Sequence, residues 1–210
     1  MKTVLAALLI FTSVASYRNG YDEVEDKLFN MLPSGNGKCA EEFARLGKCL
    51  APQEPILNLL LSEVDGDDNL LYNPAIMKHF ITITANVSDC FGEAQCEDTK
   101  FLKHLATQGV FIGQKVYGDA FHCFINADVI GITNKCEETN RPTPEQARKI
   151  FNKSDYDAVT EPLLLCTFRE LRENPSCTSS RVEDLVFAAV ALSDMYYEIL
   201  MNTKQIGVRN

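Results

Sequence analysis

Residues 182–200 read VEDLVFAAVALSDMYYEIL, and the pattern of this stretch decides the expected fold. Apolar side chains recur here every three or four positions, which is the spacing of one face of an α-helix. The face comprises Val182, Leu185, Val186, Ala189, Leu192, Tyr196, Ile199 and Leu200. A stripe of this length predicts a long helix that buries one side against the rest of the protein.

The same spacing recurs along most of the chain, and no alternating strand pattern of comparable length occurs. The β-branched run from Ile81 to Thr84 could form a strand, but its apolar spacing with Ile76 and Phe80 favours a helix. We therefore expect an all-α fold, a disulfide-bonded bundle of about seven to eight helices. Besides 182–200, we expect helices over residues 24–31, 38–50, 55–64, 74–83, 99–108 and 110–128.

Polar residues mark the expected starts of three helices. Asn73 before Pro74 combines a good N-cap with a residue suited to the first helical position. Residues 143–146 read TPEQ and form a capping box, with threonine as the cap and glutamine three positions later. Ser180 with Glu183 repeats this pattern before the last helix.

The N-terminal residues 1–16 read MKTVLAALLIFTSVAS and have the layout of a secretory signal peptide. Lys2 precedes an apolar run, and the small residues Ala15 and Ser16 offer cleavage sites. The apolar run is shorter than the roughly 20 residues that a transmembrane helix needs. We expect a secreted, extracellular protein whose mature part, residues 17–210, is a single domain.

The cysteine content supports export independently. Eight cysteines follow the signal segment, at Cys39, Cys49, Cys90, Cys96, Cys123, Cys136, Cys166 and Cys177. An even number in an exported chain predicts disulfides, and the alternative of a metal site lacks the CxxC pairs that it normally uses. Within helix 38–50, Cys39 and Cys49 would lie about 15 Å apart, beyond the Cα limit near 7 Å. Each must therefore bond elsewhere, but the sequence leaves about 105 complete pairings open.

Charge and sequons fit an extracellular protein that binds neither nucleic acid nor membranes. Without the signal segment, Lys and Arg number 20 − 1 = 19 against 29 Asp and Glu, a net charge of −10. No basic cluster interrupts this balance, which argues against nucleic acid and anionic membrane surfaces as partners.

Asn86 and Asn152 each begin an Asn-X-Ser triplet and are candidate N-glycosylation sites.

The sequence contains no catalytic or cofactor motif. The three histidines are His79, His104 and His122, and neither a lipase elbow, a zinc-protease helix nor a P-loop is present. His122 lies beside Cys123, but neighbours on a helix point in different directions. We therefore expect no catalytic residues, no cofactor, no metal and no enzymatic activity.

The middle of the chain resembles a known family of secreted domains. The cysteines of CFGEAQC at 90–96, a helical run of about 26 residues, FHC at 121–123 and KC at 135–136 carry the likeness. They resemble the secreted helical domains greatly expanded in nematodes and catalogued as domain of unknown function number nineteen. The resemblance covers residues 39–177, followed by the last helix at 180–201. It implies an extracellular, disulfide-bonded helical domain without established catalytic residues.

Two functional hypotheses follow. The first is a non-enzymatic protein that binds another extracellular protein through its surface. The alternative is a carrier of a small hydrophobic ligand such as a fatty acid, with the apolar segments 110–124 and 182–200 lining a cavity. An enzyme is a third, less favoured hypothesis, whose structural signature would be polar side chains converging in a cleft.

Overall fold

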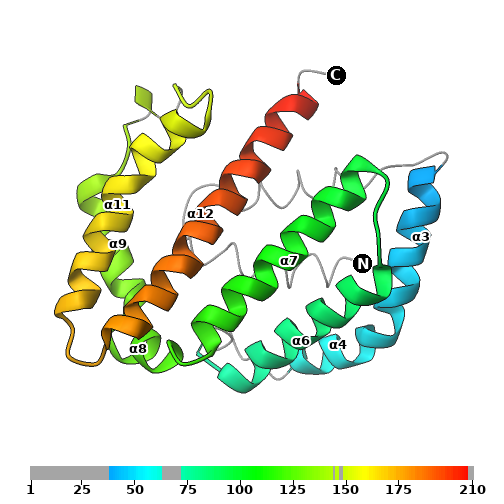
Figure 1. Ribbon diagram of the computed structural model, residues 1–210, viewed down its shortest axis with the longest axis horizontal. Helices are drawn as coiled ribbons and strands as arrows, with labels where there is room; N and C mark the ends of the chain where they lie inside the picture. Colours follow the sequence, from blue (N-terminus) through cyan, green and yellow to red (C-terminus); the bar gives the residue numbers. More distant parts are fainter. Residues whose placement is uncertain (1–37, 63–71, 144, 147–148, 208–210) are drawn as a thin grey trace. The chain divides into compact units, whose positions relative to one another are not determined.

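The computed structural model describes residues 38–62, 72–143, 145–146 and 149–207, and these residues form an all-α structure (Figure 1). The predicted fold class, a disulfide-bonded bundle of helices, is confirmed. The elements are α3 (Lys38–Leu50), the 3-10 helix η1 (Ala51–Gln53), α4 (Glu54–Ser62), α6 (Pro74–Phe91), α7 (Glu97–Tyr117), α8 (Phe121–Asn126), α9 (Val129–Asn140), α11 (Lys153–Glu173) and α12 (Ser179–Gly207).

The chain divides into two compact units, and the boundary between Gln114 and Lys115 lies inside α7. The first unit contains α3, α4, α6 and most of α7. The second unit contains α8, α9, α11 and α12. No proline or charged run marks this boundary in the sequence, and Gly113 beside it lies within α7. Residues 17–210 were expected to form one domain.

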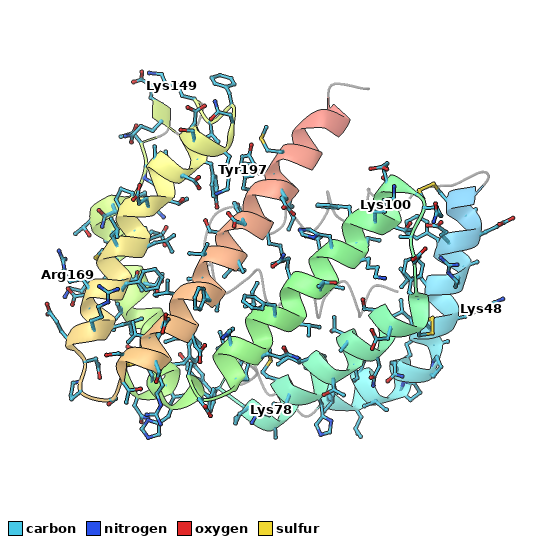
Figure 2. The ribbon with its side chains drawn as sticks, viewed as in Figure 1. Lys48, Lys78, Lys100, Lys149, Arg169 and Tyr197 are labelled. Atoms are coloured by element: carbon cyan, nitrogen blue, oxygen red, sulfur yellow. A yellow bond between two sulfur atoms is a disulfide. The ribbon has the colours of Figure 1, made fainter. Side chains whose placement is uncertain are left out.

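In the first unit, α3 packs against α6, and the predicted bounds of α3 are confirmed. Asn73 caps α6 as predicted, because its side-chain oxygen accepts hydrogen bonds from the backbone N–H groups of Ala75 and Ile76, both at 3.1 Å. The run Ile81 to Thr84 is helical, and all of its residues except Thr82 are buried. Charged side chains extend from the outer faces of these helices, as Figure 2 shows for Lys48, Lys78 and Lys100.

The predicted break between two helices near Gly109 is wrong. Residues 97–117 form one helix, and the chain turns instead at residues 118–120 before α8. A glycine inside a helix costs about 1 kcal/mol relative to alanine, which a long packed helix tolerates. Gly109 therefore weakens α7 locally without ending it.

The second unit has a core at the junction of α8, α11 and α12. Its buried members are Ala120, Cys123, Phe124, Ala127, Leu171, Val182 and Leu185. The ring centroids of Tyr117, Phe121 and Phe124 lie 5.5–6.4 Å apart beside this cluster. Much of the aromatic stripe predicted for residues 110–128 therefore packs into or beside a core.

The buried face of α12 is rotated from the predicted stripe. Val182, Leu185 and Ile199 are buried as expected, whereas Val186, Ala189, Leu192, Tyr196 and Leu200 are only half-buried. The buried face continues instead through Ala188, Ala191 and Met195. Phe187 and Val190 remain 49% and 43% exposed. Because apolar residues occur on more than one side of this helix, periodicity alone did not fix which side is buried.

Of the two predicted capping boxes, one is confirmed and one is misplaced. The Thr143 N–H donates to the side-chain oxygen of Gln146 at 2.8 Å, and the Gln146 N–H donates to Thr143 Oγ1 at 3.2 Å. For α12 the cap is Thr178, which lies two residues before the predicted Ser180. Thr178 and Ser180 are both suitable cap residues, and the helix begins after the earlier of the two.

All eight cysteines lie in the described residues and form four disulfides, two in each unit. Cys39–Cys96 encloses Cys49–Cys90 in the first unit. Cys123–Cys177 encloses Cys136–Cys166 in the second. Both units therefore have the same nested pairing, and α3 anchors two disulfides, as its cysteine spacing predicted.

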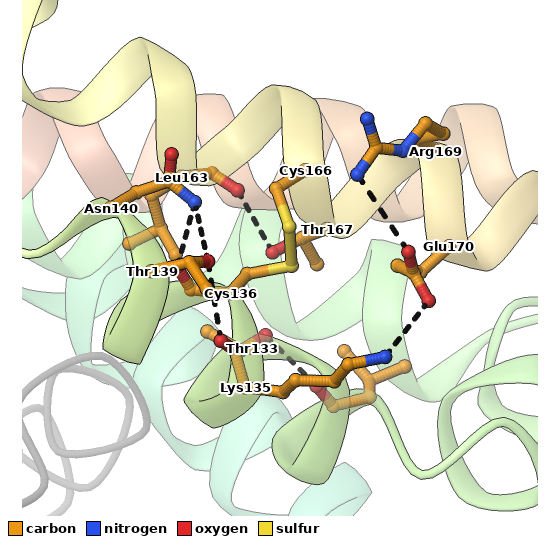
Figure 3. Close-up of a disulfide and its surroundings, with 11 residues drawn as sticks. Thr133, Lys135, Cys136, Thr139, Asn140, Leu163, Cys166, Thr167, Arg169 and Glu170 are labelled. Carbon is orange, nitrogen blue, oxygen red and sulfur yellow. Dashed lines mark hydrogen bonds and ion pairs between the residues drawn. A yellow bond between two sulfur atoms is a disulfide. The ribbon is translucent and has the colours of Figure 1, made fainter.

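Figure 3 shows how one of these disulfides joins α9 to α11. Cys136 is 1% exposed, and Asn140 closes the end of α9 by donating to the Cys136 carbonyl at 2.8 Å. Lys135 and Glu170 form an ion pair at 3.6 Å beside the disulfide. Covalent and polar contacts therefore fix the same pair of helices.

Two predictions fall on residues outside the described ranges. They are the signal peptide at 1–16 and the helix at 24–31.

Candidate functional site

The loop between α6 and α7 is held by disulfides and by side-chain contacts to its backbone. It runs from Gly92 to Gln95, and each end lies next to a disulfide, Cys49–Cys90 on one side and Cys39–Cys96 on the other. Gly92 ends α6 with φ 68° and ψ −145°, a conformation that essentially only glycine adopts. We call residues 92–95 the clamped loop.

Glu42 of α3 holds the C-terminal end of the clamped loop. One carboxylate oxygen accepts from the Gln95 N–H at 2.9 Å, and the other accepts from the Cys96 N–H at 3.2 Å and from the Thr99 hydroxyl. Glu42 is 7% exposed and Thr99 is fully buried. The carboxylate thus satisfies backbone donors at the start of α7 that have no partner within the helix.

These bonds also set the ionisation of Glu42. The hydrogen bond from Thr99 lowers the pKa of the carboxyl below its ordinary value of 4.5, against the opposing effect of burial. The backbone N–H groups of Cys96 and Gln95 and the charge of Arg45 lower the pKa further. Glu42 is therefore charged at neutral pH and serves as a fixed acceptor.

Two cations hold the other end of the clamped loop. Arg45 donates to the Glu93 carbonyl at 2.7 Å, and its guanidinium lies 4.8 Å from the centre of the buried Phe91 ring. Lys103 donates from α7 to the Gly92 carbonyl at 2.5 Å. Side chains from α3 and α7 therefore bind the backbone of the loop, which leaves its own side chains available.

Those side chains are accessible to solvent. Glu93 and Gln95 are exposed and Ala94 is half-exposed. The charged groups that clamp the loop bind its backbone, so none of them is arranged as an acid–base pair. The arrangement can present a short polar surface in one conformation, which suits recognition more than chemistry.

A second polar cluster lies in the other unit, between α11 and α12. Lys153 pairs with Asp157 on α11 and with Asp194 on α12, the latter at 2.8 Å. Its ammonium lies 5.5 Å from the ring centre of Tyr156 and 5.7 Å from that of Tyr197, which Figure 2 labels on α12. The rings of Tyr156 and Tyr197 also contact each other, with centroids 5.3 Å apart.

The protonation of this cluster argues for a structural role. Burial disfavours the charge of Lys153, but the hydrogen-bonded carboxylates of Asp157 and Asp194 outweigh that effect and raise its pKa. Burial raises the pKa of Tyr156, whose hydroxyl oxygen accepts from Ser193 at 3.4 Å. Both groups therefore hold their protons at neutral pH, so neither is activated as a base or nucleophile.

The remaining candidates for chemistry lie on three different helices or in a disulfide. His79, His104 and His122 are all exposed, on α6, α7 and α8. The side-chain amide of Asn126 lies 2.9 Å from His122 Nδ1, one turn along the same helix. Cys123 is fully buried in its disulfide with Cys177 and is not a free thiol.

The structure places both sequon asparagines on the surface. Asn86 is exposed on α6, between the half-buried Ala85 and the buried Val87. Asn152 is exposed and caps α11, where its side-chain oxygen accepts from the Asp155 N–H at 3.0 Å. Both side chains are sterically open to modification.

The described ranges contain neither a metal-binding group nor a membrane-spanning helix. Residues 38–62, 72–143, 145–146 and 149–207 contain no group of three or more His, Cys, Asp or Glu side chains that could hold a metal ion. In the same part of the chain, no helix combines the length and the apolar character needed to cross a bilayer.

Sequence reasoning missed the residues that clamp the loop, although one signal was present. Glu42 lies three positions after Cys39 and seven before Cys49, so it shares the face of α3 that carries both disulfides. A carboxylate on a buried helix face needs hydrogen-bond donors from elsewhere in the fold. That signal could identify Glu42, but it could not identify the donors.

Comparison of this chain with protein-family models, curated proteins and solved structures found no match.

Proposed function

We propose that this chain is an exported, non-enzymatic protein that binds another extracellular protein, and that the clamped loop is its recognition surface. The observation that carries the proposal is the number of independent restraints on four residues. Two disulfides, the Glu42 carboxylate and two cationic side chains all hold residues 92–95. A loop that is already ordered loses little conformational entropy when it binds, which favours affinity.

Export is part of the proposal and is supported by the cysteines. Four disulfides are typical of proteins that fold in an oxidising compartment. The signal-like residues 1–16 and the exposed sequons at Asn86 and Asn152 agree with this route. The resemblance to the nematode-expanded secreted domains remains part of the proposal and predicts the same compartment.

A partner-capture experiment tests the proposed function. The full-length secreted chain is immobilised and exposed to extracellular fluid from its source, and bound proteins are identified by mass spectrometry. A double substitution Glu93→Ala and Gln95→Ala removes the exposed loop side chains. Lys78→Ala with His79→Ala is the matched control, because it changes two exposed residues on the outer face of α6. We expect a partner that the wild type and the control retain and the loop variant loses.

Failure to capture any protein at high bait concentration would contradict the proposal. Equal capture by the loop variant would contradict the assignment of the surface. Native mass spectrometry of the same protein distinguishes the carrier alternative from the proposed function. A carrier predicts a co-purifying apolar ligand that dissociates on denaturation. No observation in the described residues favours a carrier, since Phe124, Val182 and Leu185 pack against one another in a core.

A further inference from the structure

Phe151 is the most exposed of the large apolar side chains in the described residues. It is 73% exposed, above Leu165 at 61% and Leu59 at 60%. Single apolar residues on a surface are common, but this one stands immediately before the sequon asparagine, Asn152. An aromatic ring and a glycosylation acceptor are therefore adjacent at the start of α11.

The backbone at these two positions is fixed by one residue. The Asp155 carboxylate accepts from the Phe151 N–H at 3.1 Å, and the Asp155 N–H donates to Asn152 Oδ1 at 3.0 Å. Asn152 therefore uses its side-chain oxygen in the helix cap, and its Nδ2 nitrogen takes no part in that cap. A substituent on Nδ2 leaves the capping bond intact.

We propose that an N-linked glycan on Asn152 covers the exposed ring of Phe151. The proposal rests on the proposed function, because it requires that the chain is exported. The donor is an oligosaccharide linked to a lipid diphosphate. A bond forms between Asn152 Nδ2 and C1 of N-acetylglucosamine, the C1–oxygen bond to the diphosphate breaks, the lipid diphosphate leaves, and the amide loses one proton.

The chemistry of the two groups is complementary. A pyranose ring has a face of C–H groups that packs on the face of an aromatic ring, and its hydroxyl groups stay in water. Because the sugar is attached to the next residue and that residue is fixed, the two rings meet without ordering further chain.

The second sequon supplies an internal control. Asn86 lies on α6, and none of the exposed large apolar side chains in the described part of the chain lies within four positions of it. A glycan on Asn86 therefore has no exposed ring beside it along α6. Loss of that glycan removes a similar sugar from the same protein without removing an aromatic contact.

The experiment uses the full chain secreted from a eukaryotic host and compares six proteins: wild type, Phe151→Ala, Ser154→Ala, Ser88→Ala, and each serine variant combined with Phe151→Ala. Ser154→Ala destroys the sequon but keeps Asn152 and its helix cap. Ser88→Ala destroys the other sequon and keeps Asn86. Peptide mass spectrometry reports occupancy, thermal unfolding reports stability, and nuclear Overhauser contacts between ring and sugar protons report packing.

We expect Asn152 to be occupied, with contacts between the Phe151 ring and the first sugar. Ser154→Ala should lower Tm by about 1–4 °C in wild type and by much less in the Phe151→Ala background. Because the serine substitution is the same in both backgrounds, its effect on helix propensity cancels. The change in Tm caused by Ser88→Ala should be the same whether residue 151 is phenylalanine or alanine.

Two results overturn the inference, and both differ from failure of the proposed function. The first is a secreted protein that carries no sugar at Asn152. The second is an occupied Asn152 with no ring contacts and equal Tm changes in both backgrounds. Loss of partner capture in a protein whose Phe151 is covered would overturn the proposed function alone.

Discussion

The carboxylate of Glu42 accepts a hydrogen bond from the Gln95 N–H at 2.9 Å, across 53 residues of sequence. Through this bond a side chain of α3 caps the start of α7. The Cys39–Cys96 disulfide connects the same two places. The clamped loop therefore depends on a polar contact as well as on covalent bonds, and the polar contact can be removed by a single substitution.

Glu42→Gln should loosen the clamped loop without unfolding the first unit. The glutamine side chain keeps its size but replaces one of the two accepting oxygens by an NH2 group, so a single oxygen remains for the three donors. Hydrogen exchange at the Gln95 and Cys96 amides should accelerate by about tenfold or more. The control is Glu41→Gln, since Glu41 is exposed on the same helix. Unchanged exchange at both amides would show that the carboxylate does not hold the loop.

The stability of the first unit should fall in acid because of the same residue. The pKa of Glu42 is lower in the folded protein than its ordinary value of 4.5. The stabilisation is therefore fully present above pH 4.5 and is lost as the pH falls through the folded pKa. Urea unfolding midpoints of wild type and Glu42→Gln, measured from pH 7 downward, should converge at low pH. A constant difference across that range would contradict this assignment.

Local features of the fold could be predicted from the sequence, whereas the site could not. The Asn73 cap and the box from Thr143 to Gln146 involve residues within three positions of each other, so their patterns are visible in the chain. The clamp on the loop joins Glu42 to residues 53–57 positions away, and no periodicity encodes that distance. The disulfide pairing is non-local for the same reason.

Two errors in the prediction come from local signals that the folded protein does not use. Gly109 and the pair Ser180 and Glu183 are valid local signals for a helix end and a helix start. In the folded protein, the packing of a long helix overrides the glycine, and Thr178 starts the last helix two residues earlier. Local propensity contributes about 1 kcal/mol at each position, which tertiary packing easily exceeds.

Removing one disulfide should destabilise one unit more than the other. Replacing Cys136 and Cys166 by alanine removes a cross-link between residues with a sequence separation of 30. Loop-closure entropy makes such a cross-link worth up to about 3–4 kcal/mol of stability. Native-state hydrogen exchange should accelerate in α9 and α11 and stay nearly unchanged in α3. The reciprocal control replaces Cys49 and Cys90, which should give the opposite pattern. Equal loss of protection throughout the chain would contradict two separately cross-linked units.

Two glycine-to-alanine substitutions should have opposite outcomes. An added Cβ at Gly47 meets nothing within 4 Å, so Gly47→Ala should stabilise α3 by about 0.5–1 kcal/mol. At Gly131 the Cβ would lie 2.1 Å from the Asp128 carboxylate, which caps α9 from a residue with φ 50°. Gly131→Ala should displace this cap, whose loss costs about 0.5–2 kcal/mol. This cost offsets the gain that alanine brings in helix propensity.

A double-mutant cycle checks the second substitution. Asp128→Ala should lower the free energy of unfolding in wild type and have little effect once Gly131 is alanine, because the cap is already lost. Equal effects in both backgrounds, measured by urea unfolding, would show that Gly131 does not make room for the cap.

The dissociation constant of the captured partner tests the central claim most directly. It is measured for wild type, for the variant with Glu93→Ala and Gln95→Ala, and for the control with Lys78→Ala and His79→Ala, all with matched unfolding temperatures. If the clamped loop is the recognition surface, the loop variant binds about tenfold more weakly or worse, and the control binds like wild type. Equal affinity of all three proteins would contradict the claim.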